Sequence, residues 1–74
     1  MIEILTKREM EILKLVVKGY SNEKIGKELF ITHHTVKFHL EKIYRKLGCH
    51  NKLQASMIAY KKGIVDFKNQ NLPE

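Results

Sequence analysis

The sequence is poor in the features that mark secreted, membrane and disulfide-linked proteins. It has one cysteine, Cys49, which cannot form a disulfide within the chain. No apolar run approaches the ~18 residues of a membrane-spanning helix. The N-terminal segment MIEILTKREM lacks the basic and then apolar order of a secretory signal. We therefore expect a soluble protein of the reducing cytoplasm, with no membrane partner.

Signals for strands and for interrupted helices are equally scarce. No segment alternates apolar and polar residues, and the only proline, Pro73, lies in a polar stretch near the end. A chain of 74 residues has room for one hydrophobic core, and 43% hydrophobic residues are too many for a disordered chain. The sequence predicts a single all-α domain over residues 1–66 and a polar tail over residues 67–74.

Residue patterns for catalysis or metal binding are also missing. There is no glycine-rich phosphate loop and no pair of inward-facing carboxylates, so we expect neither an enzyme nor a cofactor or small-molecule ligand. Tetrahedral zinc needs ligands in short, paired spacings. His33 and His34 are expected to point to different sides of a helix, while Cys49 and His50 stand alone after Gly48. We expect no metal site.

What the chain does have is a local excess of positive charge. The formal net charge is +6, and residues 32–52 hold five basic side chains against one acidic side chain. Four of the six excess charges therefore lie in that segment, together with all four histidines. A local positive field indicates a polyanionic partner that meets one face. A solvated, lysine-rich surface that binds nothing is the alternative that charge alone leaves open.

Capping residues and glycines divide the chain into four predicted helices. The expected N-caps are Thr6, Ser21, Thr32 and Asn51. The first and last of these begin capping boxes, Thr6 with Glu9 and Asn51 with Gln54. The third predicted helix has a regular apolar stripe of Val36, Leu40, Ile43 and Leu47.

The second and third predicted helices match a helix-turn-helix at about residues 21–40, with a recognition helix at about residues 33–47. Gly26 lies midway along the short helix, where glycine costs about 1 kcal/mol relative to alanine. This cost indicates a packing reason, namely that the recognition helix crosses closely there. Val36 is expected to pack back onto the short helix.

In these residues the chain resembles the LuxR-type, or GerE-like, transcriptional regulators, and the match covers nearly all of residues 5–65. The residues that carry the resemblance include Leu5-Thr6, Arg8-Glu9, Gly19, Ser21-Asn22, Ile25, Leu29, Ile31, Thr35-Val36-Lys37, His39, Lys46-Leu47-Gly48, Asn51, Gln54-Ala55, Ala59 and Gly63. The chain departs from the family at Gly26, Thr32 and Lys52, where alanine, serine and arginine are usual.

The resemblance implies a four-helix DNA-binding domain of a sequence-specific transcriptional regulator that binds double-stranded DNA as a homodimer on inverted repeats. The chain looks like the stand-alone GerE type, and the isolated effector domain of a larger response regulator is an alternative. RNA polymerase is a further candidate partner. A basic helical module that binds an acidic protein is the rival hypothesis, and RNA binding is a third.

The candidate DNA-binding residues lie on or beside the predicted recognition helix. They are Thr32, His33, His34, Thr35, Lys37, Phe38, Glu41, Arg45, Lys46 and Lys52. Lys37 is expected to contact bases or phosphates, as the resemblance also implies. Thr32 and Thr35 at the helix start are expected to hold a phosphate, although capping alone would also explain Thr32. Lys46 and Lys52 are expected to contact the DNA backbone, with plain solvation as the alternative.

Two other side chains, Phe38 and Glu41, leave two interpretations open, and a third, His39, has one expected role. Phe38 either packs on a thymine methyl or covers the junction with the second helix. Glu41 either accepts from a cytosine amino group or pairs with Lys37 or Arg45 within the helix, and we favour the pair. His39 is expected to be partly buried and hydrogen-bonded.

The fourth predicted helix, at about residues 52–62, has apolar residues on two sides. Ala55, Ile58 and Ala59 suit close packing in the core. The opposite side is left for a symmetric partner and comprises Leu53, Met57, Tyr60 and Ile64. The alternative is a single wide core face that neighbouring elements reach from both sides, with the tail folded back onto the helix.

Overall fold

The structure is a computed structural model that describes residues 5–64. It contains α1 (Lys7–Val17), α2 (Asn22–Leu29), α3 (His33–Leu47) and α4 (Lys52–Lys61), with no strand in the described residues. The all-α prediction and the four predicted helices are confirmed. The predicted polar tail, residues 67–74, lies outside the described residues.

Each helix begins at the predicted capping side chain. Thr6 Oγ1 accepts from Glu9 N at 3.0 Å, and Glu9 Oε1 accepts from Thr6 N at 2.9 Å, so the first capping box is complete. The second box differs from the expected pattern. Asn51 Oδ1 accepts from Gln54 N at 2.9 Å, but Gln54 Oε1 accepts from His50 N at 2.8 Å instead of the N-cap nitrogen.

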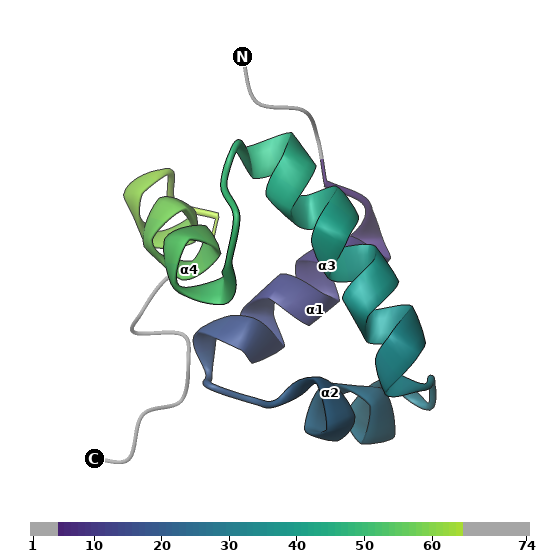
Figure 1. The fold of residues 1–74 in the computed structure, drawn as a ribbon. Helices are drawn as coiled ribbons and strands as arrows, with labels where there is room; N and C mark the ends of the chain where they lie inside the picture. Colours follow the sequence, from purple (N-terminus) through teal and green to yellow (C-terminus); the bar gives the residue numbers. More distant parts are fainter. Residues whose placement is uncertain (1–4, 65–74) are drawn as a thin grey trace, which may run out of the picture.

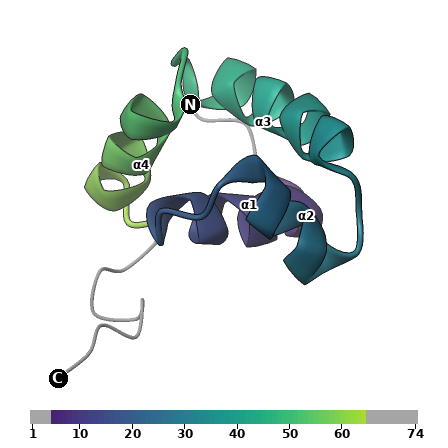
Figure 2. The same cartoon turned by 60° about the horizontal axis from the view of Figure 1, so that its bottom comes forward.

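The core lies where α1, α3 and α4 meet, and α2 packs against the first half of α3, the longest helix of the described residues (Figures 1 and 2). The predicted stripe of α3 is buried, with Val36 and Ile43 fully enclosed. Ala55 and Ala59 of α4 are also fully buried, and their small side chains permit a close approach to the other helices. This packing turns the polar side of α3 toward solvent.

The tight connection between α2 and α3 explains Gly26. A Cβ at this position would lie 2.5 Å from the carbonyl oxygen of Ile31, which is closer than real side-chain contacts come. The next nearest atoms are backbone atoms of Thr32 and His33, at 3.4 and 3.5 Å. The predicted packing reason is therefore confirmed, although the closest neighbour is the connection and not the body of the recognition helix.

None of the helices between residues 5 and 64 is long and apolar enough to cross a membrane.

Candidate nucleic-acid interface

The side of α3 that faces away from the core carries the groups expected to meet DNA. We call this set of exposed side chains the α3 outer face; it comprises His34, Lys37, Phe38, Glu41, Lys42 and Arg45. The helix places them together because each residue turns ~100° from the last, so the buried stripe occupies the other side. Three cations against one carboxylate make the face electropositive. Such a face suits a major groove that is lined by phosphates.

Phe38 and Lys42 contact each other on this face. The Phe38 side chain is 54% exposed, and Lys42 Nζ lies 4.7 Å from the centre of its ring. The His39 ring meets the same ring edge-on at a centroid distance of 6.1 Å. Lys42 was missed as a candidate site residue, although an aromatic followed four residues later by a lysine is a recognisable signal on a helix.

One prediction about this helix is wrong, and a second is met only in part. Of the ion pairs between residues 5 and 64, none involves Glu41, so its favoured pair with Lys37 or Arg45 does not form. An exposed pair at this spacing contributes only about 0.3–0.5 kcal/mol, which is too little to fix two long side chains. His39 is partly buried as expected, but it makes no hydrogen bond within the described part of the chain.

The first turn of α3 is held by its two threonines. Thr32 Oγ1 accepts from Thr35 N at 3.1 Å and lies 3.1 Å from Thr35 Oγ1. The rings of His33 and His34 lie 4.1 Å apart, so the prediction that they point to different sides is wrong.

The histidines do not build a metal site in this structure. Among the residues from Leu5 to Ile64, no group of three or more histidine, cysteine, aspartate or glutamate side chains is placed to hold a metal ion. Cys49 is buried, and burial raises the pKa of its thiol above the usual value. The thiol therefore stays protonated at neutral pH.

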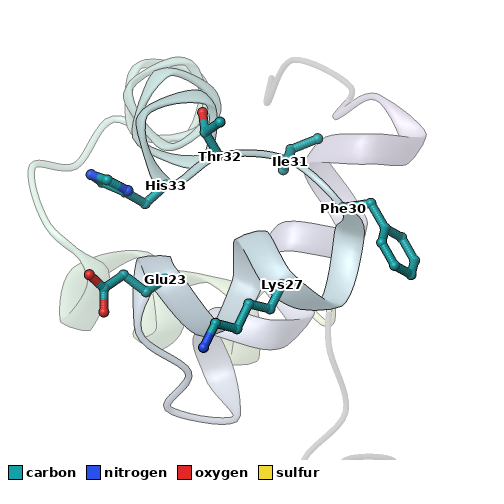
Figure 3. A pocket seen from close by; sticks show the side chains of 6 residues that line it. All are labelled: Glu23, Lys27, Phe30, Ile31, Thr32 and His33. Atoms are coloured by element: carbon teal, nitrogen blue, oxygen red, sulfur yellow. The ribbon is translucent and has the colours of Figure 1, made fainter.

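A shallow hollow lies at the connection between α2 and α3. It is lined by Glu23, Lys27, Phe30, Ile31, Thr32 and His33. In Figure 3, Glu23 and His33 lie on one side, and Phe30 points away from them into solvent. Phe30 is 93% exposed and has a left-handed backbone with φ of 60°. The sequence pattern did not single out Phe30 as an exposed residue.

Lys46 makes a contact that no helix pattern shows. Its Nζ donates to Glu9 Oε1 at 2.8 Å, and the two side chains are 21% and 4% exposed. Burial alone would raise the pKa of Glu9, but the hydrogen bonds from Lys46 and Thr6 and the charge of Lys46 hold it below its usual value. The predicted DNA contact of Lys46 therefore competes with a structural role, whereas Lys52 is a partly buried residue at the start of α4.

Helix α4 presents an apolar stripe to solvent. Leu53, Met57 and Tyr60 are 70%, 60% and 38% exposed, and we call these three residues the α4 outer stripe. Ile64 was predicted to belong to it but packs against the core instead. The helix ends at Lys61, and Gly63, with φ of 72°, turns the chain so that Ile64 N donates to Ala59 O.

Comparison with known proteins agrees with this arrangement. The family model for bacterial regulatory proteins of the luxR family matches residues 3–59. The chain belongs to the LuxR family. Members of this family are DNA-binding transcription regulators, and the four helices form the family's helix-turn-helix DNA-binding domain.

Two curated relatives are longer than this LuxR-family chain. The transcriptional regulatory protein LiaR of Bacillus subtilis (strain 168) is 47% identical over 64 residues, which are 86% of this chain and 30% of LiaR. The oxygen regulatory protein NreC of Staphylococcus aureus (strain JH9) is 43% identical over 65 residues, which are 88% of this chain and 30% of NreC.

Two solved structures share the fold. The response regulator ChrA of a heme-sensing two-component system aligns with a TM-score of 0.82 and 40% identity, over 85% of this chain and 31% of ChrA. The transcription factor GerE aligns with a TM-score of 0.79 and 34% identity, over 86% of this chain and 96% of GerE.

Proposed function

We propose that this LuxR-family domain recognises specific sequences in double-stranded DNA by inserting α3 into the major groove, and that it regulates transcription in the cytoplasm. The observation that carries the proposal is the α3 outer face, where cations and an exposed aromatic lie opposite a buried stripe. Lys37 has the chemistry for a guanine edge or a phosphate, Phe38 for a thymine methyl and Arg45 for a phosphate. His33, His34 and Thr35 lie at the end that enters the groove.

We further propose that two copies of the domain bind together through the α4 outer stripe. Burial of this stripe removes from water the apolar surface that the small core does not cover. A two-fold axis that passes between the two copies of α4 makes the interface self-complementary. The two recognition helices would then enter successive major grooves ~34 Å apart, on an inverted repeat with half-site centres ~10 bp apart.

A longer regulator that carries this unit as its effector domain is the second candidate arrangement. LiaR, NreC and ChrA support it, because this chain matches about a third of each of them. GerE supports the other arrangement, in which the DNA-binding domain acts on its own, because the match spans 96% of GerE. The α3 outer face has the same role in both arrangements.

The proposal is tested by selection from random duplex DNA, followed by competition with scrambled duplex and with RNA. We expect the domain to enrich paired, inverted half-sites and to bind them at least ~10³-fold more tightly than scrambled duplex. Equal competition by the scrambled duplex would show that the basic surface binds DNA without sequence preference. Better competition by RNA than by duplex DNA would support the RNA-binding hypothesis. Capture of an acidic protein, with no preference for any DNA sequence, would support the protein-interaction module.

A further inference from the structure

The contact between Lys42 and Phe38 gives the α3 outer face a feature beyond its charge. The two residues are one helical turn apart, and the Nζ-to-ring distance of 4.7 Å lies well within the ~6 Å reach of a cation–π contact. Glu41 is adjacent in sequence, yet no ion pair to it forms among the described residues. The aromatic ring is therefore the partner that positions Lys42.

The same contact also positions the ring. An exposed phenylalanine on a helix ordinarily samples several rotamers, and its ordering on DNA would cost free energy. Here Lys42 lies over one face of the Phe38 ring, and the His39 ring lies beside it in a T-shaped arrangement. With these contacts in place Phe38 is still 54% exposed, on the side of α3 that faces away from the core. The two contacts thus favour this orientation of the ring over its other rotamers before any ligand arrives.

Lys42 keeps hydrogen-bonding capacity while it lies over the ring. An ammonium group has three N–H donors, and the face of one ring does not use all of them. The ammonium is on the exposed side of α3, where the phosphates that border a major groove would pass. A cation at this position can bind a phosphate and hold the aromatic ring at the same time.

We propose that Lys42 and Phe38 read DNA as one unit, in which Lys42 binds a phosphate and holds the Phe38 ring against the methyl group of a neighbouring thymine. This inference rests on the proposed function of α3. It makes Lys42 a positioning residue for base recognition in addition to a phosphate contact. The affinity gained from the thymine methyl should therefore depend on Lys42.

The test uses a duplex enriched by selection with the wild-type chain, in which each thymine is replaced in turn by deoxyuridine. One replacement should weaken wild-type binding about four-fold, the effect of one buried methyl. In Lys42→Met the same replacement should cost less than two-fold, and in Phe38→Ala it should have no effect. Lys14→Met, which removes an exposed lysine of α1, is the control that keeps the full four-fold effect.

Two further readouts separate positioning from charge. Lys42→Met should reduce the slope of log affinity against log salt by about one unit in the wild-type background and by less in Phe38→Ala. In the DNA-free chain, ring currents should shift the Lys42 ε-methylene protons upfield, and Phe38→Leu should abolish that shift. An unshifted signal in the wild type would overturn the inference.

The outcomes distinguish this inference from the proposed function. If the wild type enriches no sequence, the proposed function itself fails. If it enriches a sequence but Lys42→Met shows the same penalty for deoxyuridine as the wild type, the two residues act independently and only the coupled unit is overturned.

Discussion

The ammonium of Lys46 lies 2.8 Å from the carboxylate of Glu9 and ties the last turn of α3 to the first turn of α1. The same Glu9 oxygen accepts a hydrogen bond from Thr6 N, so one carboxylate caps a helix and joins two helices. Each charge also lies at the helix end whose dipole favours it. The pair fixes the recognition helix relative to the core.

We expect Lys46→Met to lower the free energy of unfolding by about 2 kcal/mol, because it leaves the buried Glu9 carboxylate without its cation. Urea denaturation measures the change, and Lys37→Met, at an exposed position of the same helix, should change stability by less than ~0.5 kcal/mol. Unchanged stability together with a weaker salt dependence of DNA binding would instead make Lys46 a phosphate contact.

The lowered pKa of Glu9 predicts a loss of stability in acid. Its pKa in the folded chain lies below the ordinary value of 4.5, so the ionised form is favoured by folding. That contribution is complete above the unfolded-state pKa and is lost as the pH falls through the folded-state pKa. Glu9→Gln should therefore be less stable than wild type at pH 7 and lose less stability between pH 7 and strong acid. Parallel pH profiles would contradict this role.

The close approach at Gly26 predicts that the alanine usual in the family does not fit this chain. Gly26→Ala gains about 1 kcal/mol of helix propensity, but its Cβ would meet the Ile31 carbonyl at 2.5 Å. Overpacking against backbone costs about 1–3 kcal/mol, so we expect a net loss of about 1 kcal/mol. Lys27→Ala, at the next and exposed position of α2, should be nearly neutral. A more stable Gly26→Ala variant would show that the connection between α2 and α3 shifts easily to make room for the added methyl group.

The α4 outer stripe predicts a dimer that one charge disrupts. Met57→Glu places a carboxylate near its symmetry copy and should weaken association by several kcal/mol while the chain stays helical. Sedimentation and circular dichroism measure the two properties. The control is Lys14→Glu, a larger change of charge on an exposed residue of α1. A Met57→Glu chain that unfolds would assign the stripe to the core, and one that stays dimeric would place the interface elsewhere.

The sequence predicted those features of the fold that depend on residues a few positions apart. Thr6 and Thr32 cap their helices because the capping bond spans three residues. The stripe from Val36 to Leu47 is buried because its spacing follows the helical period. Both are local patterns, which can be recognised without knowledge of how the helices pack.

The missed features depend on packing or on a single backbone angle. Lys46 and Glu9 are 37 residues apart, and no pattern within one helix pairs them. Ile64 leaves the α4 outer stripe because Gly63 adopts a positive φ. Phe30 takes a left-handed conformation that is uncommon for a large side chain, so its exposure could not be predicted from its apolar character.

The most direct test of sequence-specific recognition by α3 is one ratio of affinities. It compares a selected inverted repeat with a scrambled duplex of the same length and composition, at one salt concentration. We expect a ratio of at least ~10³ for the wild type, and a fall of about ten-fold in Lys37→Ala because a base contact is lost. A wild-type ratio near one would contradict sequence-specific recognition, and a Lys37→Ala chain that loses equal affinity for both duplexes would assign Lys37 to the phosphate backbone.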